Sequence, residues 1–407
     1  MKVIIMAGGK GTRVSGIADD VPKPMIKIAG KPVLEHQIEC LRRQGFDDIT
    51  ISIGYKGDVI KSYFGDSIKY IEEDKPLGTA GALYYLHDKI DDDILLINGD
   101  VIFDISLQRF ITAHHENERD FNKRENKTSS GFATIFTHPN DHPYDSGIVI
   151  ADTNGRVTQW LTKEDERKWY KNRVNAGLHI LSPALIKCFT QKKKVDLDRD
   201  ILKPLIKENA LYIYDSPEYV KDMGTPERIQ ETEQAILNGV VAAKNLENKQ
   251  TALLIDRDGT INKYVKFLND INNFEIINEA VDMIKTANRE GKLVIVITNQ
   301  PVIARGDLTW EELHEIHNKM ETLLGEKGAF IDDIFICPHH PDKGFDGERV
   351  EYKIDCECRK PKPGLILQAA KKYNLDLAKS TMVGDRETDI EAGRKAGVGN
   401  LVLVNYE

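Results

Sequence analysis

The sequence predicts an α/β fold with two domains. Short β-rich runs alternate with helical patterns along the chain, which is typical of βαβ units and largely parallel sheets. These runs include Val3–Met6, Ile94–Ile97, Ala252–Ile255 and Leu293–Ile297. Two of them, at Val3 and at Ala252, lead directly into loops dense in glycine and charged residues, and we interpret each as the first strand of a domain. The length of 407 residues is enough for about two to three domains.

The boundary between the domains is predicted from a helix and the polar stretch after it. Thr225 followed by Pro226 is typical of a helix N-cap and first turn, and the pattern continues to about Leu237. The chain then runs through a polar stretch that ends at Gln250. We therefore expect an N-terminal domain over 1–239, a linker over 240–250 and a C-terminal domain over 251–407.

Charge and cysteine content restrict the possible partners. The chain has 56 basic and 65 acidic residues and a net charge of −9. This argues against nucleic acid or an anionic membrane as the main partner, because both favour a basic surface. The apolar run from Val3 to Ala7 is too short for a signal sequence or a membrane span. Five cysteines exclude a complete disulfide framework, and three of them lie close together, which favours a metal in a cytoplasmic protein.

A glycine-rich loop follows the first strand. Gly8, Gly9 and Gly11 allow the backbone to approach phosphates closely and to direct its N–H groups at them. Arg13 and Lys23 add positive charge where a triphosphate would sit. The spacing fits neither a P-loop nor a dinucleotide-binding fingerprint. A glycine-rich turn with surface cations is the plainer alternative.

Two carboxylates in the first half are candidates for a magnesium site. Asp100 follows an apolar strand, at the carboxyl end where open α/β sheets bind ligands. Asp222 lies just before the helix that Thr225 caps. Together with phosphates, these carboxylates predict a Mg²⁺ site. The alternative for Asp222 is simple capping of that helix.

The motifs of the first half resemble those of the sugar-1-phosphate nucleotidyltransferases. The matching pieces are GGKGTR from Gly8, PKP from Pro22, LGTAGAL from Leu77, NGD from Asn98, VNAG from Val174 and KDMGTPE from Lys221. The resemblance implies a Rossmann-like, glycosyltransferase-A-like mixed sheet. It also implies a reaction in which a sugar 1-phosphate attacks the α-phosphorus of a nucleoside triphosphate and pyrophosphate leaves.

By this resemblance each matching residue has an expected role. Arg13 and Lys23 are catalytic through charge neutralisation, and Asp100 and Asp222 bind Mg²⁺. Lys163 and Asn175 reach the sugar phosphate, although the usual Glu-Lys pair of the family stands here as Thr162-Lys163. The residues assigned to the nucleotide are Gly8, Gly9, Gly11, Thr12, Arg13, Lys23, Gly78 and Gly81.

The second half begins with two carboxylates one residue apart. Asp256 and Asp258 follow a buried strand, where they would repel each other without a cation. Mg²⁺ resolves that repulsion and leaves one carboxylate free to attack phosphorus. Later strands end in hydrogen-bond donors or carboxylates, and a separate segment supplies cations. These residues are Thr298 and Asn299, Arg359 and Lys360, and Asp385 with Asp389.

In this order, these pieces resemble the haloacid dehalogenase superfamily of phosphatases over about 252–407. The resemblance implies a parallel sheet with a minimal cap and a nucleophilic Asp256, with Asp258 as general acid and later as base. Thr298 and Lys360 then bind the phosphoryl group. Mg²⁺ is held by Asp256, Asp385 and the main-chain carbonyl of Asp258, whereas Asp389 fits a structural role as well as a ligand role.

Cysteines and histidines predict a second metal. Cys337, His339, Cys356 and Cys358 have the ligand count of a closed structural zinc site, with His340 as the rival fourth ligand. Three reduced cysteines and an incidental histidine are the plainer alternative. The surrounding sequence, CPHHP and CECRKPKPG, resembles the heptose bisphosphate phosphatases; histidinol phosphatases share the zinc loop. The run from Ile303 to Gly306 favours the heptose branch, in which Arg305 and Arg359 contact substrate.

The two resemblances together predict consecutive reactions. The C-terminal domain would remove the 7-phosphate of D-glycero-D-manno-heptose 1,7-bisphosphate. The N-terminal domain would then transfer a nucleotidyl group, GMP from GTP, to the heptose 1-phosphate and release pyrophosphate. The expected cofactors are one Mg²⁺ site per domain and a structural Zn²⁺; assembly into homo-oligomers stays open. The rival hypotheses are another sugar with a histidinol-phosphatase-like or other phosphatase, or one half that is a non-catalytic regulatory module.

Overall fold

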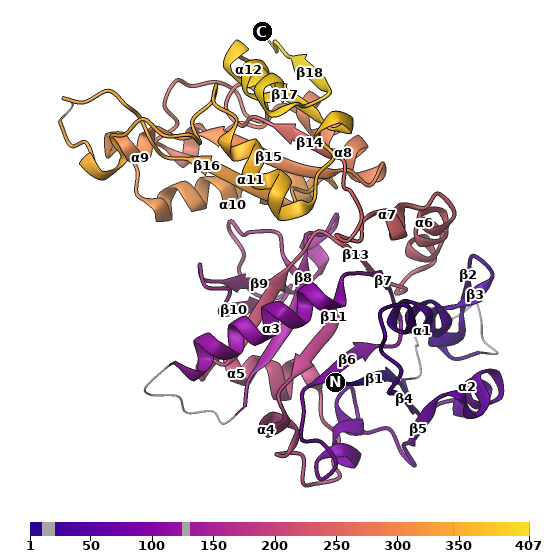
Figure 1. The fold of residues 1–407 in the computed structure, drawn as a ribbon. Helices are drawn as coiled ribbons and strands as arrows, with labels where there is room; N and C mark the ends of the chain where they lie inside the picture. Colours follow the sequence, from indigo (N-terminus) through magenta and orange to yellow (C-terminus); the bar gives the residue numbers. More distant parts are fainter. Residues whose placement is uncertain (10–20, 124–130, 345, 407) are drawn as a thin grey trace. The chain divides into compact units, whose positions relative to one another are not determined.

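The structure is a computed structural model that describes residues 1–9, 21–123, 131–344 and 346–406 (Figure 1). The described residues form two compact units. The first unit contains residues 1–138, 149–160 and 175–245, and the second contains 139–148, 161–174 and 246–407. The predicted α/β class is confirmed in both units, whereas the predicted division at 239 and 251 stays a prediction.

The first unit is built on a mixed sheet of nine described strands. Its main path runs β10-β9-β11-β6-β1-β4-β5, with β8 beside β11 and β12 beside β8. β1 pairs in parallel with β4 and β6, and β11 is antiparallel to β6. The strands are β1 (Lys2–Ala7), β4 (Ile49–Ile53), β5 (Lys69–Glu72), β6 (Ile94–Asn98), β8 (Ala133–His138), β9 (Ile148–Ala151), β10 (Val157–Leu161), β11 (Val174–Leu181) and β12 (Leu211–Asp215).

Two short sheets complete the strands of this unit. β7 (Val101–Asp104) pairs antiparallel with β13 (Tyr219–Asp222), and β2 (Lys27–Ile28) pairs with β3 (Lys31–Pro32). The helices are α1 (Val33–Arg43), α2 (Gly57–Phe64), α3 (Leu107–Asn122), α4 (Pro183–Ile186), α5 (Lys203–Lys207), α6 (Pro226–Leu237) and α7 (Val240–Ala243), with short helical turns η2 (Lys23–Met25), η3 (Gly65–Ser67), η4 (Gly81–Leu86) and η6 (Leu197–Leu202).

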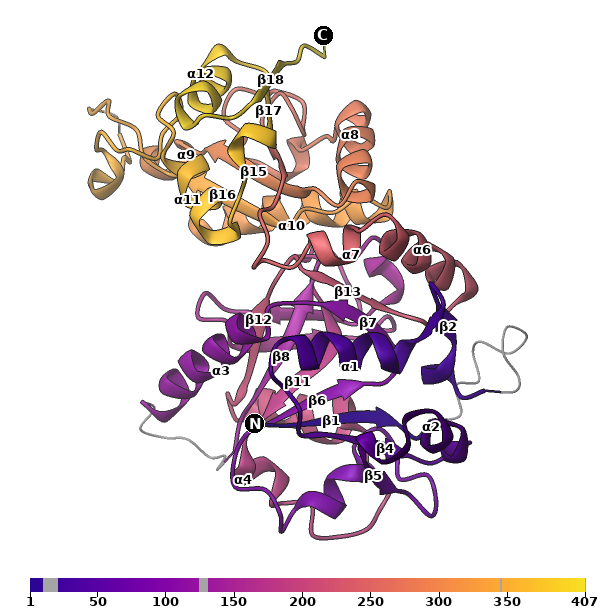
Figure 2. The same ribbon diagram turned by 45° about the vertical axis from the view of Figure 1, so that its right-hand side comes forward.

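Alternation along the central strands produces a core on each face of the first sheet. Val3 and Ile5 belong to one apolar cluster, whereas Ile4 between them belongs to another. Successive side chains of a strand point to opposite faces, so both faces of β1 are covered. Helix α3 packs against β8 and β12, and α1 packs against β7 (Figure 2).

The second unit is built on a parallel sheet of five strands in the order β16-β15-β14-β17-β18. The strands are β14 (Ala252–Ile255), β15 (Leu293–Asn299), β16 (Asp333–Cys337), β17 (Thr381–Gly384) and β18 (Asn400–Leu403). The helices are α8 (Asn278–Arg289), α9 (Val302–Arg305), α10 (Trp310–Glu326), α11 (Gly364–Tyr373) and α12 (Glu387–Ala396), with short turns η5 (Pro143–Asp145), η7 (Ile271–Asn273), η8 (Val350–Tyr352) and η9 (Leu377–Lys379). Because all five strands are parallel, their carboxyl ends lie at one edge of the sheet.

Residues 139–148 and 161–174 belong to the second unit although they precede it in the chain. Their main anchor is Arg173, which is buried and lies 3.2 Å from Glu321 of α10. Its guanidinium also donates to the carbonyl of Asp332 at 2.7 Å, and the Asn172 main-chain N–H donates to Glu321 at 3.0 Å. A buried charge with a partner and several acceptors is satisfied, so these segments form an integral part of the unit.

The helix start predicted at Thr225 is confirmed, because Thr225 caps α6 by accepting from the Arg228 N–H. Thr309 and Glu312 form a capping box that opens α10. Of the two cysteines outside the metal cluster, Cys40 is buried and Cys188, which follows the four-residue helix α4, is exposed.

Candidate active sites

Asp100 and Asp222 of the first unit lie side by side. Asp100 lies between β6 and β7, and Asp222, the last residue of β13, pairs with Val101 at the start of β7. The Met223 N–H donates to the Asp100 carbonyl at 2.8 Å, which fixes the two chain segments together. The sheet thus brings together two carboxylates that are 122 positions apart in the sequence.

Each of these carboxylates has a cationic partner. Lys23 forms an ion pair with Asp100, and Arg228 donates from Nη1 to both oxygens of Asp222, at 2.9 and 2.7 Å. Carboxylate oxygens are ligands that Mg²⁺ prefers. Here the negative charges of the two carboxylates are balanced by Lys23 and Arg228. Lys23 thus lies next to a candidate metal ligand, and its predicted contact with phosphate stays a prediction.

Part of the predicted nucleotide loop lies outside the described residues, namely Gly11, Thr12 and Arg13. Gly8 follows β1 directly, and its carbonyl accepts from the Tyr55 N–H. A Cβ on Gly9 would meet no atom within 4 Å, so this residue is open on that side.

Gly78 and Gly81 have packing reasons to be glycine. Gly78 has a φ of +85°, and a Cβ there would lie 2.3 Å from the carbonyl oxygen of Val195. A Cβ on Gly81 would lie 2.0 Å from Cβ of Leu77. These approaches explain the two residue types without a ligand, and their nucleotide-binding role stays a prediction.

Asn175 lies on β11 with its side chain fully engaged. Its oxygen accepts from His179 at 3.1 Å and from the Gly177 N–H at 3.2 Å, and its amide nitrogen lies 3.4 Å from Asp198. Lys163, the other predicted sugar-phosphate contact, belongs to the second unit; it is exposed, with its ammonium 4.0 Å from Glu164.

Asp198 is a candidate that sequence reasoning missed. Burial, with the negative charge of Asp196 adding to it, raises the pKa of Asp198 to about 6. A carboxyl beside Asn175 with a raised pKa is suited to exchanging hydrogen bonds with sugar hydroxyls. The sequence around it, DLDRD, resembles an ordinary solvated acidic turn, so no pattern marked this residue.

In the second unit, three carboxylates gather around one lysine. Asp256, Asp385 and Asp389 each offer an oxygen, and these oxygens lie within 4.8 Å of one another. The buried Lys360 ammonium lies 2.6 Å from Asp256 and 2.7 Å from Asp389. Burial raises the pKa of Asp256, with Lys360 opposing the shift and Asp389 adding to it. A buried oxygen of Asp385 has no hydrogen-bond partner. The cluster therefore offers the oxygen ligands that a cation such as Mg²⁺ binds, and one of these oxygens is not used by another contact.

The side chain of Asp258 does not join this cluster. Its carboxylate accepts from Arg257 at 2.7 and 2.8 Å and from Gln300 at 2.8 Å. Burial alone would raise the pKa of Asp258, but the charge of Arg257 and the hydrogen bonds to the carboxylate outweigh it and lower that pKa. This is compatible with the prediction that only the main-chain carbonyl of Asp258 serves a metal.

Thr298 and Asn299 end β15 at the same edge of the sheet. The Thr298 hydroxyl is buried and accepts from Gln300 at 2.8 Å. Asn299 exchanges two hydrogen bonds, both 3.1 Å, with the main chain of Lys360. Asn299 thereby fixes the segment that carries Lys360, which is a positioning role that the sequence did not predict.

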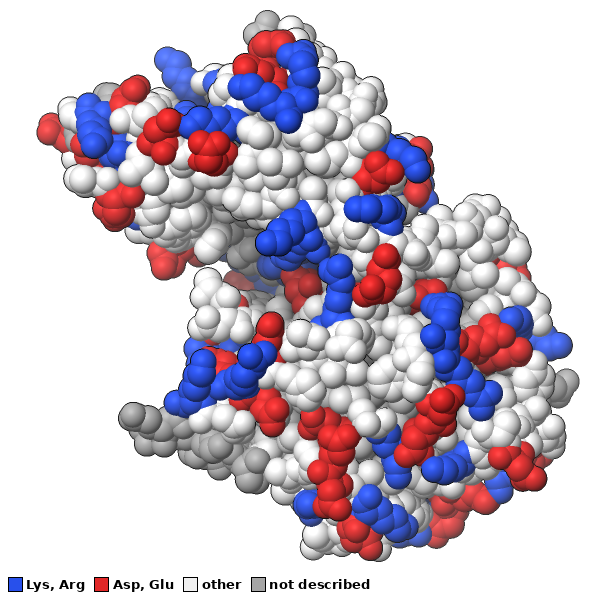
Figure 3. All heavy atoms as spheres, viewed as in Figure 1, with Lys and Arg blue, Asp and Glu red and all other residues white. Residues whose placement is uncertain are grey.

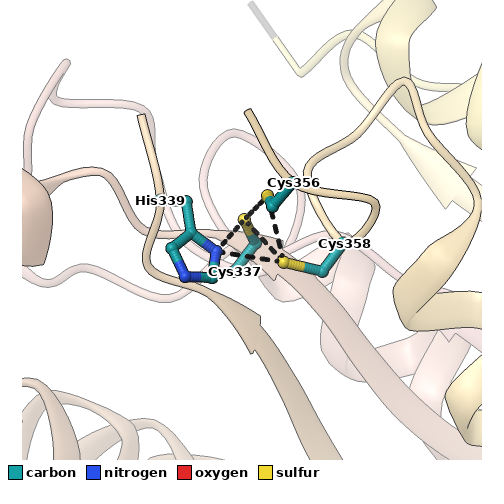
Figure 4. Close-up of side chains that lie close together, drawn as sticks. All are labelled: Cys337, His339, Cys356 and Cys358. Carbon is teal, nitrogen blue, oxygen red and sulfur yellow. Dashed lines mark hydrogen bonds between the residues drawn. The ribbon is translucent and has the colours of Figure 1, made fainter. Parts of the chain in front are cut away.

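Cys337, His339, Cys356 and Cys358 converge on one point (Figure 4). The sulfur–sulfur distances from Cys358 to Cys337 and to Cys356 are both 3.2 Å, and its sulfur lies 3.2 Å from Nδ1 of His339. The Cys337 sulfur lies 3.6 Å from the Cys356 sulfur and 3.8 Å from Nδ1 of His339. Four ligands at zinc-bond lengths around one ion would be separated by roughly 3.5–3.8 Å, so two of these separations match and three are shorter by a few tenths of an ångström. The set therefore fits a tetrahedral metal. His340 is not among these four clustered residues, and its Nδ1 accepts from the Asp342 N–H.

The two predicted substrate arginines are held by different neighbours. Arg359 donates to the His339 carbonyl at 3.1 Å, which links it to the cysteine loop. Arg305 bonds to Asp307 at 2.7 Å and stacks over Phe267 at 4.3 Å. On the face shown in Figure 3, basic and acidic side chains are interspersed. No helix in the described part of the chain is long and apolar enough to cross a membrane.

Comparison with known proteins identifies both parts of the chain. The family described as "Nucleotidyl transferase" matches residues 2–239, which is more than half of the sequence. The chain belongs to this nucleotidyl transferase family. A second family, described as HAD-hydrolase-like, matches residues 357–405.

Two kinds of curated proteins are similar to this nucleotidyl transferase, namely heptose bisphosphate phosphatases and a guanyltransferase. The D-glycero-beta-D-manno-heptose-1,7-bisphosphate 7-phosphatase of Yersinia pestis is 40% identical over 153 residues, 38% of this chain and 79% of the relative. The D-glycero-alpha-D-manno-heptose-1,7-bisphosphate 7-phosphatase of Photorhabdus laumondii is 43% identical over 157 residues, 39% of this chain and 84% of the relative. The mannose-1-phosphate guanyltransferase of Debaryomyces hansenii is 33% identical over 239 residues, 56% of this chain and 62% of the relative.

The match extends over 79% and 84% of the two phosphatases, so the chain belongs to their family as well. The chain is therefore a bifunctional enzyme, with a nucleotidyltransferase part and a phosphatase part, as the sequence predicts.

Proposed function

We propose that the two activities are consecutive steps in the activation of a heptose. The phosphatase removes the 7-phosphate of D-glycero-D-manno-heptose 1,7-bisphosphate, and the nucleotidyltransferase joins the remaining 1-phosphate to GMP from GTP. The observation that carries this proposal is the carboxylate cluster around Lys360, in a chain of which 153 residues match a heptose bisphosphate phosphatase at 40% identity. The choice of GTP is supported by the relative that is a guanyltransferase.

In the phosphatase reaction, Asp256 is the nucleophile. A bond forms from its carboxylate oxygen to phosphorus as the bond from phosphorus to O7 breaks. The proton that O7 takes comes from the protonated form of Asp258, whereas the hydrogen bonds from Arg257 and Gln300 favour its carboxylate form. Water then attacks the phosphorus, Asp258 takes a proton from that water, and the bond from Asp256 to phosphorus breaks. Lys360 and Thr298 bind the phosphoryl oxygens, and Lys360 also holds the nucleophile in place at 2.6 Å.

In the nucleotidyl transfer, the chain aligns two anions. An oxygen of the sugar 1-phosphate attacks the α-phosphorus, and the bond to the pyrophosphate oxygen breaks. Lys23 neutralises charge on the phosphates beside Asp100, and Arg13 is assigned the same task by its motif. Asn175 of the first unit is proposed to contact the sugar phosphate.

Three metal sites follow from the donors that are present. Asp100 and Asp222 would hold Mg²⁺ in the first unit; Asp256, Asp385 and the Asp258 carbonyl would hold it in the second. Bound Mg²⁺ supplies charge neutralisation on the phosphate oxygens. The three cysteines and His339 would hold a structural Zn²⁺. The five free cysteines favour a cytoplasmic location.

The decisive experiment incubates the full chain with heptose 1,7-bisphosphate and each nucleoside triphosphate in turn, and identifies the nucleotide sugar by mass. Both anomers are needed, because the two phosphatase relatives are named for different ones. We expect GDP-heptose, phosphate and pyrophosphate. A panel with histidinol phosphate and other sugar phosphates serves as the control. Phosphate release from heptose bisphosphate no faster than from this panel would contradict the proposal.

A further inference from the structure

The carboxylate of Asp258 is held by the residue before it in the chain. Arg257 donates from Nε and Nη2 to Oδ1, at 3.1 and 2.8 Å, and from Nη2 to Oδ2 at 2.7 Å. Gln300 donates to Oδ2 at 2.8 Å and Asn262 lies 3.2 Å from Oδ1. Both oxygens therefore accept hydrogen bonds, and the side chain cannot turn without losing several of them.

Arg257 is itself fixed by a histidine 60 residues later. Its side chain is fully buried, and its Nη1 lies 3.1 Å from Nε2 of His317 on α10. A guanidinium has donors only, so Nε2 of His317 must be the acceptor, and the proton of this neutral imidazole lies on Nδ1. Burial, with the positive charge of Arg257 adding to it, lowers the pKa of His317 well below its ordinary value.

This chain of contacts has a direction. His317 orients one end of the guanidinium, and the other end of the same rigid plane orients the carboxylate of Asp258. A planar group with five N–H donors transmits orientation in a way that a flexible ammonium does not. The carboxylate is held as an acceptor through both oxygens, which is the form that receives a proton from water.

We propose that Arg257 and His317 are positioning residues of the phosphatase, which hold Asp258 in the orientation of the general base that breaks down the aspartyl-phosphate at Asp256. The inference rests on the phosphatase activity proposed above. It goes beyond that activity, because it assigns a function to a histidine on α10 that does not belong to the carboxylate cluster around Lys360. A mere core histidine would affect stability alone.

The test separates the two half-reactions with p-nitrophenyl phosphate. Its leaving group departs without a proton, so formation of the phosphoenzyme does not need Asp258 as an acid, whereas breakdown still needs it as a base. The full chain is compared with His317→Leu, which removes the acceptor, and with His317→Gln, which keeps one. Glu315→Gln, at an exposed position of α10, is the matched control.

We expect His317→Leu to lower kcat about 10- to 100-fold per folded molecule, with KM changed less than about threefold, since a positioned base contributes about 10²–10⁴-fold. A burst of one equivalent of nitrophenol should precede the slow steady state, because breakdown has become limiting. His317→Gln and the control should stay within about threefold of the parent. Arg257→Lys, which keeps the charge without the planar fork, should behave like His317→Leu and replaces it if that variant does not fold.

Equal kcat values for the Leu and Gln variants, or a low kcat without a burst, would overturn the inference. Neither result would touch the proposed function as long as the parent hydrolyses heptose bisphosphate. A parent that releases no phosphate from either substrate would instead contradict the proposed function itself.

Discussion

Replacement of Lys360 by methionine is expected to weaken the second unit and to remove most phosphate release. The substitution keeps the length of the side chain but removes the ammonium, which lies 2.6 Å from Asp256, 2.7 Å from Asp389 and 2.7 Å from the Ile297 carbonyl. Leaving buried carboxylates without their cation costs about 3–5 kcal/mol, and a unit of this size loses about 2–4 °C of unfolding midpoint per kcal/mol. The expected loss is therefore about 6–20 °C without added divalent metal.

The pH dependence of this loss has a definite sign. The pKa of Asp256 in the folded chain is already raised, because burial outweighs Lys360, and removal of Lys360 raises it further. A group with a raised folded pKa contributes stability below its unfolded pKa and loses that contribution as the pH rises through the folded pKa. The stability of the variant should therefore be close to that of the parent at about pH 4 and clearly lower at neutral pH.

The assay is thermal unfolding of the full chain over this pH range, with phosphate and pyrophosphate release measured at saturating Mg²⁺. Phosphate release should fall by about 10²-fold or more, since one positioned charge at a developing oxyanion contributes about that much. Pyrophosphate release should not change. Lys362→Met is the matched control, because Lys362 pairs with the exposed Asp355 and Glu357. A loss below about 1 kcal/mol, or equal behaviour of the two variants, would refute the reasoning.

Three further predictions concern the other sites. Asp256→Asn should abolish phosphate release and spare pyrophosphate release, and Asp100→Ala should do the reverse; loss of both activities from either change would mean that the sites are not independent. Metal analysis should find zinc in the purified chain, and Cys356→Ser should remove it and speed hydrogen exchange in the cysteine loop; a zinc-free parent would contradict the assignment. Glu321→Ala leaves Arg173 buried without its partner and should cost about 3–5 kcal/mol in denaturant unfolding. Glu321→Gln keeps an acceptor and should cost less, so a negligible effect of the alanine variant would show that the pair is unimportant.

The strand ends were predictable from the sequence for a simple physical reason. Parallel strands bring their carboxyl ends to one edge, so polar residues that directly follow apolar runs must meet there. Asp256, Thr298 and Asp385 follow this rule, and the spacing of the cysteines added Cys337 at the end of β16.

The residues that hold these groups in place were not predictable in the same way. His317 occupies an apolar face of a helix, where a histidine is ordinarily a core residue, and only the folded chain shows it against Arg257. Arg173 resembles a surface cation in the sequence, yet it is buried against Glu321. Contacts between residues about 60 and about 150 positions apart leave no periodic pattern along the chain.

The composition of the second unit from three chain segments has a consequence for its separation from the rest. Cleavage after Asn245 would yield a fragment, 246–407, that lacks residues 139–148 and 161–174. Glu321 would then be left without the guanidinium of Arg173, and Thr322 without the Tyr170 N–H. A phosphatase excised in this way is a truncated protein. Its stability and activity should be compared with those of the same fragment mixed with peptides 139–148 and 161–174. New fusions of these two activities keep the Arg173–Glu321 contact only if those 24 residues accompany the phosphatase.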